Sequence, residues 1–315
     1  MREAYGRPLP RMNLSDLAGK LIVIEGTDGV GRSTQIDLLK PWLEELGHAV
    51  LDTGMTRSLL AGEGIRRAKE GNNLGRVTQS LFYATDFVDR LENEIVPALR
   101  AGFIVLTDRY IYSQMARAIV RGMDPRWIRN IFGVALKPDA IFYLRLGIDQ
   151  LVPRVVLSRG FDYWESGMDL YPGLDMYDSF CNYQAALLAE FDRLSAEYKF
   201  ETIDASADVQ SVFAQLKTKI LNVLDRNLHD RDLHDRDLHD RHLSTAALAS
   251  RAGLTLVAQA PTFSAHPPRA AEGLRASEAS RAPAALRASE ASRAPEALRE
   301  PAALREPGRA ASHLK

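Results

Sequence analysis

An apolar run that leads directly into a glycine-rich loop constrains this chain more than any other feature. Residues 20–34 read Lys-Leu-Ile-Val-Ile-Glu-Gly-Thr-Asp-Gly-Val-Gly-Arg-Ser-Thr. The segment that follows, 33–46, carries apolar side chains at helical spacing and stops at Gly47. The spacing from Gly26 to Ser33 fits the phosphate-binding pattern G-x-x-x-x-G-K-[ST] at every fixed position except Arg32. The sequence therefore predicts a phosphate-binding loop between a strand and a helix, and favours binding of a nucleoside triphosphate.

The residue types of this loop suit phosphate groups. Glycines allow the backbone to approach an oxyanion without Cβ clashes, and the next helix directs the positive end of its dipole at the same anion. The Ser33 hydroxyl is placed to ligate Mg²⁺, and a cation at position 32 is placed to reach the β and γ phosphates. Arg32 keeps the charge of the usual lysine but replaces a compact ammonium with a wide planar fork. We expect ATP to be held by Gly26, Thr27, Asp28, Gly29, Val30, Gly31, Arg32, Ser33 and Thr34.

Short apolar runs alternate with segments of helical spacing along the first 224 residues. The runs are nearly continuous, as expected for strands covered on both faces. They lie at 21–24, 49–51, 103–106, 140–144 and 200–203, and the helical segments at 33–46, 76–99, 124–136, 148–158, 178–198 and 208–224. This alternation predicts an α/β three-layer fold with a parallel sheet of about five strands and crossover helices. The stretch 159–177, with three glycines and a proline, is interpreted as a long mobile loop.

The composition changes sharply near residue 225. All three tryptophans, all ten tyrosines and ten of eleven phenylalanines lie before it, so the earlier part can bury a core and the later part lacks the side chains to do so. Six of the seven histidines lie in the later part, four of them within repeats such as Leu-His-Asp-Arg-Asp over 228–242. A step of five residues places successive histidines on different helix faces, which favours a solvated extension over the alternative of a metal or partner site. We expect an N-terminal arm over 1–18, a globular domain over 19–224 and a low-complexity, disordered tail over 225–315.

Charge and cysteine content exclude several classes of protein. The net charge is −1, so no global charge favours nucleic acid or an anionic membrane as partner. The single cysteine, Cys181, rules out an internal disulfide and suits a reducing compartment. The chain contains neither an apolar run long enough to span a membrane nor a secretory signal, so a cytoplasmic location is expected.

At this point the sequence resembles the thymidylate kinase family of nucleoside monophosphate kinases. The resemblance starts with residues 25–35 and continues with Asp108-Arg109-Tyr110 and Ser113 after the third predicted strand. Residues 95–102, Pro138-Asp139 and 203–205 also fit, so the resemblance spans roughly 19–224. It implies a P-loop kinase fold with a lid at about 154–177, a nucleoside monophosphate as acceptor, and a homodimer.

The resemblance implies roles for particular residues. Asp28 meets the acceptor sugar, Arg109 grips the acceptor phosphate, and Asp108 lies near the metal that Ser33 ligates. The lid arginines close over the transferring phosphoryl group, which makes Arg154 and Arg159 catalytic together with Arg32, Asp108 and Arg109. The alternatives are a strand-end ion pair for Asp108 and Arg109, and ordinary solvated residues for Arg154, Arg159, Asp162 and Glu165.

Departures from the family pattern gather in the acceptor base pocket. The family's Arg-Glu-Pro segment is missing, and Arg57 lies three residues beyond the matching positions. Phe87 occupies the position of an arginine that reads the pyrimidine edge, and Arg117 follows Ala116 where the family has tyrosine. We expect the substrate to contact Asp28, Tyr83, Phe87, Arg109, Ser113 and Arg117, although Tyr83 and Phe87 also suit a helix core.

The sequence thus favours Mg²⁺-dependent transfer of the ATP γ-phosphate to a nucleoside monophosphate, with dTMP as the family default. One alternative is a P-loop kinase for a different small acceptor, suggested by the altered pocket. Another is a catalytically weak nucleotide-binding module that acts through its tail, suggested by Arg32.

Overall fold

Five parallel strands form one sheet among the residues that the structure describes. The computed structural model describes residues 2–71 and 74–225. The strands are β1 (Lys20–Glu25), β2 (Val50–Gly54), β3 (Ile104–Asp108), β4 (Ala140–Arg145) and β5 (Glu201–Asp204), in the order β2-β3-β1-β4-β5. Every neighbouring pair is parallel. The predicted parallel sheet of about five strands is therefore confirmed.

Helices cover both faces of this sheet. Their bounds are α1 Arg32–Glu45, α2 Gly62–Glu70, α3 Arg76–Arg90, α4 Val96–Arg100, α5 Ile111–Val120, α6 Pro125–Ile131, α7 Ile148–Ser158 and α8 Met176–Tyr198. A π-helical turn, Leu91–Ile95, joins α3 to α4, so the helix predicted over 76–99 is one run with a widened turn inside it. Short 3₁₀ turns lie at Leu14–Asp16 and Phe132–Val134, and a further helical stretch covers 209–225.

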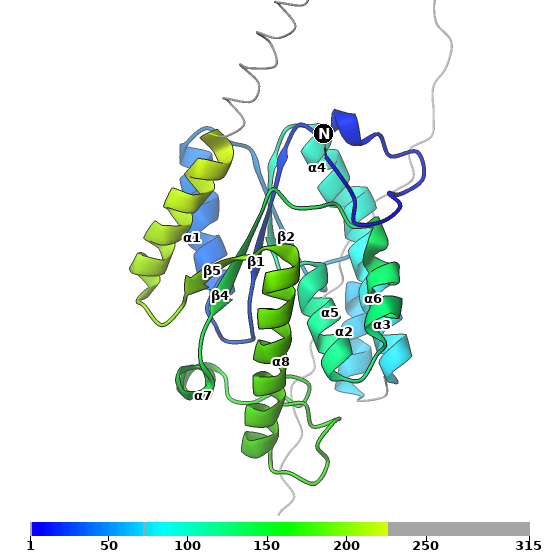
Figure 1. Cartoon of the computed structure of the whole chain (residues 1–315), viewed down its shortest axis with the longest axis vertical. Coiled ribbons are helices and arrows are strands. Elements are labelled where there is room, and N and C mark those ends of the chain that lie inside the picture. The colour runs from blue at the N-terminus through cyan, green and yellow to red at the C-terminus, as the bar shows by residue number, and fades with distance from the viewer. Residues whose placement is uncertain (1, 72–73, 226–315) are drawn as a thin grey trace, which may run out of the picture. The chain divides into compact units, whose positions relative to one another are not determined.

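Alternate residues of the central strand enter two separate cores. Leu21 and Val23 of β1 pack with side chains of α3, α5 and α8, whereas Ile22 and Ile24 pack with α1, α7 and the 209–225 helix. Figure 1 shows α1 on one side of the sheet and α3 and α5 on the other. This arrangement is the three-layer α/β fold that the alternation of strands and helices predicted.

Two helices, α2 and α5, were missing from the sequence prediction. In α5 seven of ten residues are buried, and two of these, Ser113 and Gln114, are polar, so burial extends beyond its apolar face. In α2 only Ile65 is buried, and two of its nine residues are glycines, which disfavour helix. Ion pairs of Glu63 with Arg66 and Arg67, and of Arg66 with Glu70, run along α2.

The N-terminal arm lies along the segment that leads into β4. Ala4 forms an antiparallel bridge with Leu136, and the Tyr5 and Gly6 amides donate to the Ala135 and Gly133 carbonyls at 2.9 and 2.6 Å. These contacts attach the described part of the arm to the folded domain. The predicted tail over 225–315 lies, apart from residue 225, outside the described residues.

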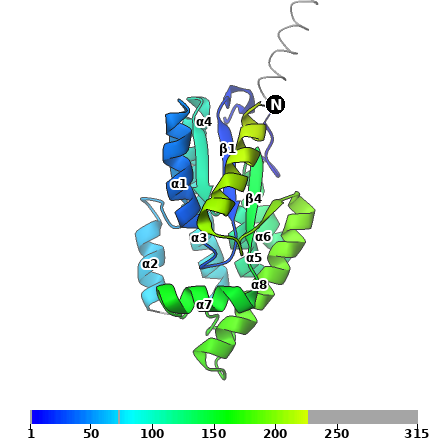
Figure 2. The same ribbon diagram turned by 90° about the vertical axis from the view of Figure 1, so that its left-hand side faces the viewer.

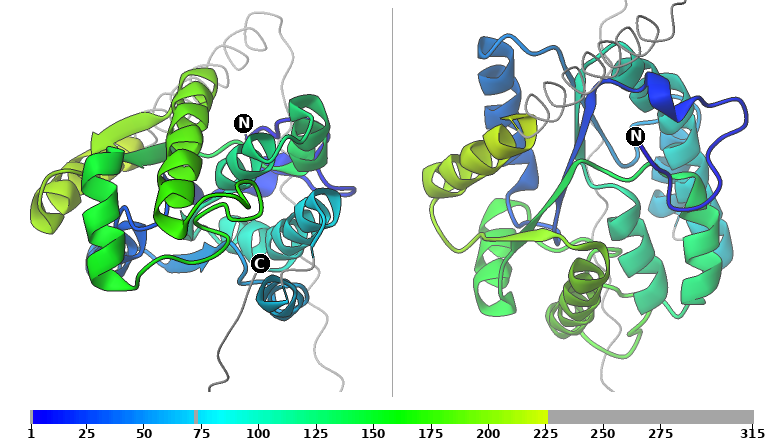
Figure 3. Two further views of the ribbon diagram at one scale, coloured as in Figure 1. Left: turned by 90° about the horizontal axis from the view of Figure 1, so that it is seen from below. Right: turned by 45° about the horizontal axis from the view of Figure 1, so that its top comes forward.

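The carboxyl ends of β1 and β3 lie next to each other in the sheet. Ile24 pairs with Asp108, so the glycine-rich loop after β1 and the Asp-Arg turn after β3 leave the sheet at the same level. Helix α7 crosses the direction of α1 at this end of the sheet (Figure 2), and the left view of Figure 3 looks onto the same end from below. In open parallel sheets this edge is where ligands bind. None of the described helices is long and apolar enough to cross a membrane.

Candidate active site

The glycine-rich loop turns through backbone conformations that only glycine adopts freely. Gly26, Gly29 and Gly31 have φ values of 148°, 81° and 103°. A Cβ atom on Gly29 would lie 2.5 Å from Cγ2 of Val155, because α7 packs directly against the loop. Helix α1 begins at Arg32, with Gly31 as its N-cap, so unpaired backbone N–H groups face the space that the loop encloses. The loop therefore lies between a strand and a helix, as predicted, and the binding of phosphate there stays a prediction.

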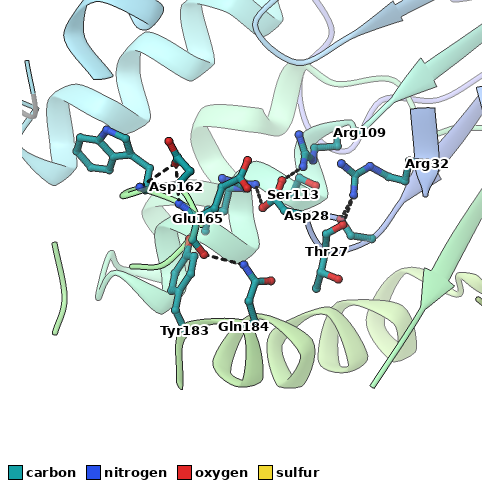
Figure 4. A network of polar contacts seen from close by, with 12 residues as sticks. Thr27, Asp28, Arg32, Arg109, Ser113, Asp162, Glu165, Tyr183 and Gln184 are labelled. Atoms are coloured by element: carbon teal, nitrogen blue, oxygen red, sulfur yellow. Dashed lines mark hydrogen bonds and ion pairs between the residues drawn. The ribbon is translucent and has the colours of Figure 1, made fainter. Parts of the chain in front are cut away.

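The Arg32 guanidinium is folded into its own loop. Nη1 donates to the carbonyl oxygen of Gly26 at 2.6 Å and to that of Thr27, and Nε donates to Oδ1 of Asp108 at 2.8 Å. The side chain is only 6% exposed. Within the described part of the chain no group bonds to Nη2. The wide fork of arginine thus bonds to the loop and to Asp108 at once, and Figure 4 shows its bond to Thr27.

Asp108 joins the phosphate loop to the end of β3. Its second oxygen, Oδ2, accepts a hydrogen bond from the Ser33 hydroxyl at 3.0 Å. Burial opposes ionisation of Asp108, but the guanidinium groups of Arg32 and Arg109 hold its pKa below the ordinary value. The carboxylate therefore stays charged, and with the exposed Ser33 hydroxyl it offers two hard oxygen ligands at one point. The described residues contain no group of three or more His, Cys, Asp or Glu side chains that could hold a metal ion by themselves.

Asp28 is the buried acid at the centre of the site. It is 2% exposed and accepts hydrogen bonds from Arg109 and from Arg117, one on each oxygen. Burial alone would raise the pKa of Asp28, but these two guanidinium groups lower it well below the ordinary range. Two cations on one acid leave a surplus of positive charge, which suits an anionic ligand.

Arg109 follows β3 in a left-handed backbone conformation, with φ at 67°. Its amide donates to the Ile24 carbonyl at 3.0 Å, and its own carbonyl accepts from the Thr107 hydroxyl at 2.7 Å. These bonds hold a conformation that is unfavourable for a residue with a Cβ atom. The strained turn directs the guanidinium at Asp28, and its buried Nε bonds to no described residue.

Glu25 supports this turn from below. Fully buried, it accepts hydrogen bonds from the amides of Tyr110 and Ser113 at 2.8 and 3.2 Å and from the Ser113 hydroxyl at 2.6 Å. Burial raises the pKa of its carboxyl group. Glu25 thereby satisfies the free amides at the start of α5, the helix that carries Arg117.

A pocket opens beside Arg117, between α3, α5 and the 159–175 loop. Gln114 lines it with a side chain that is 4% exposed, and neither its Oε1 nor its Nε2 has a hydrogen-bond partner among the described residues. An amide buried without partners is costly unless a ligand satisfies it. The lining residues are Met55, Gln79, Ser80, Tyr83, Gln114, Arg117, Ala118, Arg121, Ile128, Phe132 and Trp164.

Comparison with known proteins agrees with this geometry. The sequence model of the thymidylate kinase family matches residues 24–168. The protein named "Probable thymidylate kinase 2" of Saccharolobus solfataricus is 34% identical over 214 residues, which cover 67% of this chain and all of that protein. The chain belongs to the thymidylate kinase family. The "Probable thymidylate kinase" of Thermococcus kodakarensis is 36% identical over 143 residues (42% of this chain, 70% of that protein), and the "Thymidylate kinase" of Brachyspira hyodysenteriae is 27% identical over 208 residues (65% and 94%).

Membership of the thymidylate kinase family makes the chain a nucleoside monophosphate kinase, in a family that uses ATP as phosphoryl donor. The loop residues predicted to hold ATP differ in their burial. Val30 is buried in the core beside α1, Thr27 has a buried hydroxyl without a partner, and Thr34 is exposed in the first turn of α1. Their contacts with ATP remain predictions.

The predicted acceptor residues of this chain separate into two groups. Tyr83 and Arg117 line the pocket, whereas Phe87 is fully buried and packs edge-on against Tyr110 and Phe132, as the alternative core interpretation proposed. Ser113 is also buried and bonds to Glu25. Phe87 and Ser113 thus lie behind the pocket and do not line it.

The predicted lid arginines make contacts of two kinds. Arg154 donates to the Ala205 carbonyl at 2.9 Å, which ties α7 to the segment after β5. Arg159 donates to Oε2 of Glu165 at 2.5 Å, and its side chain is 49% exposed. The Arg159 guanidinium also helps to lower the pKa of Asp28, after the larger effects of Arg109 and Arg117. Arg57 bonds to Asp52 at 2.9 Å beside the end of β2.

Sequence reasoning missed several residues of the site. No role was predicted for Glu25, although it belongs to the motif. Gln114 was not predicted as a site residue, although it follows Ser113 directly. Lys69 of α2 also belongs here, because burial and the Arg117 guanidinium both lower its pKa. Only the position of Gln114 on the same helix turn as Arg117 could have signalled a pocket residue.

Proposed function

We propose that this chain transfers the γ-phosphoryl group of ATP to a pyrimidine nucleoside monophosphate, with dTMP as the acceptor. The observation that carries the proposal is Asp28, an acid of the glycine-rich loop that is bound by Arg109, which follows β3, and by Arg117, which lines the pocket. The catalytic unit is proposed to span 19–224, with 1–18 as an arm and 154–177 as the lid. The identity with relatives named thymidylate kinase, 27% and 34%, supports the choice of acceptor.

The chemistry requires charge and alignment more than a base. The acceptor phosphate is already anionic, so one of its oxygens attacks the γ-phosphorus while the bond to the β–γ bridging oxygen breaks and ADP leaves with that oxygen. Arg109 and Arg117 would orient the acceptor phosphate, and Nη2 of Arg32 would meet the donor phosphates. Arg154 and Arg159 remain proposed as the groups that close over the transferred phosphoryl group.

Mg²⁺ fits the oxygen atoms present at the end of β3. The Ser33 hydroxyl and the Asp108 carboxylate lie 3.0 Å apart, and both are ligands that Mg²⁺ accepts alongside phosphate oxygens. When bound, the ion would neutralise charge on the donor phosphates.

The unpaired amide of Gln114 supports a pyrimidine base in the pocket. An amide carries one acceptor and two donors in a plane, which complements the N3–H and O4 edge of thymine. Tyr83 and Trp164 supply the flat apolar surfaces that a base needs. Phe87 occupies the position at which the family has an arginine that reads the base edge. We therefore propose that Gln114 makes this contact instead.

An ADP-release assay across nucleoside monophosphates tests this function. The full chain is assayed with ATP and Mg²⁺ and with dTMP, dUMP, dCMP, AMP or GMP as acceptor. We expect dTMP to give the highest kcat/KM. The proposal would be overturned if no acceptor raises turnover above the background ATPase rate. A preference for AMP or GMP would show that the acceptor is a purine nucleotide and not dTMP.

One observation favours the alternative of a weak nucleotide-binding module. Arg32 donates three of its hydrogen bonds to the protein itself, so less of its fork faces the nucleotide than a bare ammonium would present. Binding of ATP without acceptor-dependent turnover, together with a strong gain in Arg32→Lys, would establish that alternative.

A further inference from the structure

Three consecutive carbonyl groups in the loop after α7 each accept a hydrogen bond from a different side chain. The Trp164 carbonyl accepts from Nη2 of Arg121 at 3.0 Å. The Glu165 carbonyl accepts from Nε2 of Gln184 at 2.8 Å, a contact visible in Figure 4, and the Ser166 carbonyl accepts from the Ser179 hydroxyl at 2.7 Å. We call Arg121, Ser179 and Gln184 the carbonyl anchor.

The donors of the carbonyl anchor are unusually buried for polar side chains. Arg121 is 3% exposed, and Ser179 and Gln184 are fully buried. They come from the end of α5 and from α8, two helices that pack on each other. A buried polar side chain destabilises a core unless it is hydrogen-bonded, and these three find partners in the backbone of one loop segment. The three buried donors thus hold the backbone of residues 164–166 against helices α5 and α8.

Arg121 makes further contacts that fix its position. Its Nε and Nη2 donate to the two Asp169 oxygens at 2.9 and 3.1 Å, and Nη1 donates to the Tyr183 hydroxyl. The guanidinium lies 4.7 Å from the centre of the Tyr183 ring and 5.9 Å from that of Trp164. Gly167 packs so closely that a Cβ atom there would lie 2.6 Å from Cγ of Tyr183.

The anchored segment forms part of the proposed acceptor site. Trp164 lines the pocket, and its indole N–H donates to the Lys69 carbonyl at 2.9 Å. The neighbouring Glu165 binds Arg159 at 2.5 Å. By contrast, a Cβ atom on Gly160, four residues before Trp164, would meet no described atom within 4 Å. A Cβ atom on Gly173, after the anchored segment, likewise meets no described atom within 4 Å, so the predicted lid divides into open parts near Gly160 and Gly173 and a firmly held part at 164–167.

We propose that Arg121, Ser179 and Gln184 are positioning residues for the acceptor. They hold Trp164–Ser166 as a fixed wall of the acceptor pocket, while movement of the lid is confined to residues on either side of 164–167. Arg121 does not itself react; it acts through the positions of Trp164 and Glu165. The consequence for acceptor binding rests on the proposed function, whereas the fixed position of Trp164 does not.

The first experiment measures the fixed wall without reference to activity. Trp42→Phe and Trp127→Phe together leave Trp164 as the sole tryptophan, and neither residue belongs to the site. Because Trp164 is 5% exposed, its fluorescence should resist acrylamide quenching. Adding Arg121→Gln or the milder Ser179→Ala should shift quenching toward that of a free indole, whereas Arg126→Gln, at an exposed arginine of α6, should not.

The second experiment measures the effect on the acceptor. In the otherwise unchanged chain, Arg121→Gln should raise KM for dTMP about tenfold or more and leave KM for ATP unchanged, since loss of alignment by about an ångström has effects of this size. Arg121→Lys, which keeps one donor and the charge, should recover part of the loss. Circular dichroism confirms folding, and Ser179→Ala serves if Arg121→Gln does not fold.

The outcomes separate the two proposals. If the wild-type chain phosphorylates no pyrimidine monophosphate, the proposed function fails, while quenching of Trp164 still tests the anchor. If Trp164 is quenched equally with and without the anchor side chains, or if KM for dTMP is unchanged in a folded Arg121→Gln or Ser179→Ala variant, the positioning role is overturned. Equal increases in both KM values indicate general destabilisation and overturn it as well.

Discussion

The Arg117 guanidinium of α5 donates to Asp28, the only acid within the glycine-rich loop. This bond links the segment that cradles the donor phosphates to the helix that lines the acceptor pocket. Burial lowers the pKa of Arg117, but the Asp28 carboxylate outweighs it and raises the pKa above the ordinary value. Both partners therefore stay charged over the whole physiological range.

Asp28→Asn should destabilise the chain and impair acceptor binding. Removing one charge leaves two largely buried guanidinium groups uncompensated, and loss of one partner from such a pair costs about 3–5 kcal/mol. Urea unfolding measures the change in the free energy of unfolding. Asp52→Asn, in the exposed pair with Arg57, is the control and should cost less than about 1 kcal/mol. Equal losses in the two variants would contradict the central role of Asp28.

Glu25→Gln should flatten the dependence of stability on pH. Because burial raises the pKa of Glu25 above its ordinary value of 4.5, its protonated form is favoured in the folded state. Its contribution to stability is present below pH 4.5 and is lost as pH rises through the folded pKa. Glutamine removes that titration, so the difference in unfolding free energy between pH 5 and pH 8 should shrink. A difference as large as in the wild type would disprove the assignment.

Gln114→Leu should weaken discrimination between pyrimidine acceptors more than it weakens ATP binding. A site that loses its hydrogen-bonding group for the substrate loses selectivity, here by roughly 10–100-fold in kcat/KM for dTMP. Steady-state kinetics with dTMP, dCMP and ATP measure the effect. Gln215→Leu, at an exposed glutamine on the 209–225 helix, is the matched control. If dTMP and dCMP respond alike, Gln114 does not read the base.

Arg32→Lys should preserve acceptor-dependent turnover within about tenfold, because the charge is kept although the brace to Asp108 is lost. Arg32→Gln should lower kcat by roughly 10²–10³-fold, since an uncharged group cannot stabilise the transferring phosphoryl group. Measured kcat values with saturating dTMP and ATP decide between these roles. Similar kcat values for wild type and Arg32→Gln would remove Arg32 from the catalytic set.

Gly29→Ala should weaken ATP binding through contact with α7. Its φ of 81° strains any alanine, and Cγ2 of Val155 lies 2.5 Å from the new methyl group. Gly31→Ala is the control, because its φ is 103° but no described atom lies within 4 Å of the new Cβ. Val155→Ala should therefore restore part of the ATP affinity of Gly29→Ala and none of that of Gly31→Ala. Equal responses would show that backbone strain alone matters.

Most of the fold could be predicted from the glycine pattern and the apolar strand segments, because both follow from local chemistry. The spacing from Gly26 to Ser33 needs only the loop itself, and buried parallel strands are apolar whatever surrounds them. Helix α5 was not predicted, and part of its burial falls on the polar residues Ser113 and Gln114, which a pattern of apolar residues does not mark.

The acceptor side was harder to foresee because it depends on contacts between distant segments. Nothing local distinguishes Phe87, which is buried in the core, from Tyr83, which lines the pocket one helical turn earlier. Gln114 becomes notable only once its amide is known to lack partners. Arg121 and Gln184 are separated by more than sixty residues and meet only in the folded chain.

The pairing of Ile24 with Asp108 has a consequence for random mutagenesis. Successive residues of a strand point to opposite faces of the sheet. A slip of one residue between β1 and β3 would therefore move core-facing side chains to the opposite face and displace Asp108 from the phosphate loop. Substitutions at buried strand positions such as Val23 and Val105, remote from any nucleotide, should therefore be recovered in genetic screens as loss-of-activity alleles. Such a screen would therefore identify buried strand residues as necessary for activity although they do not contact the substrates.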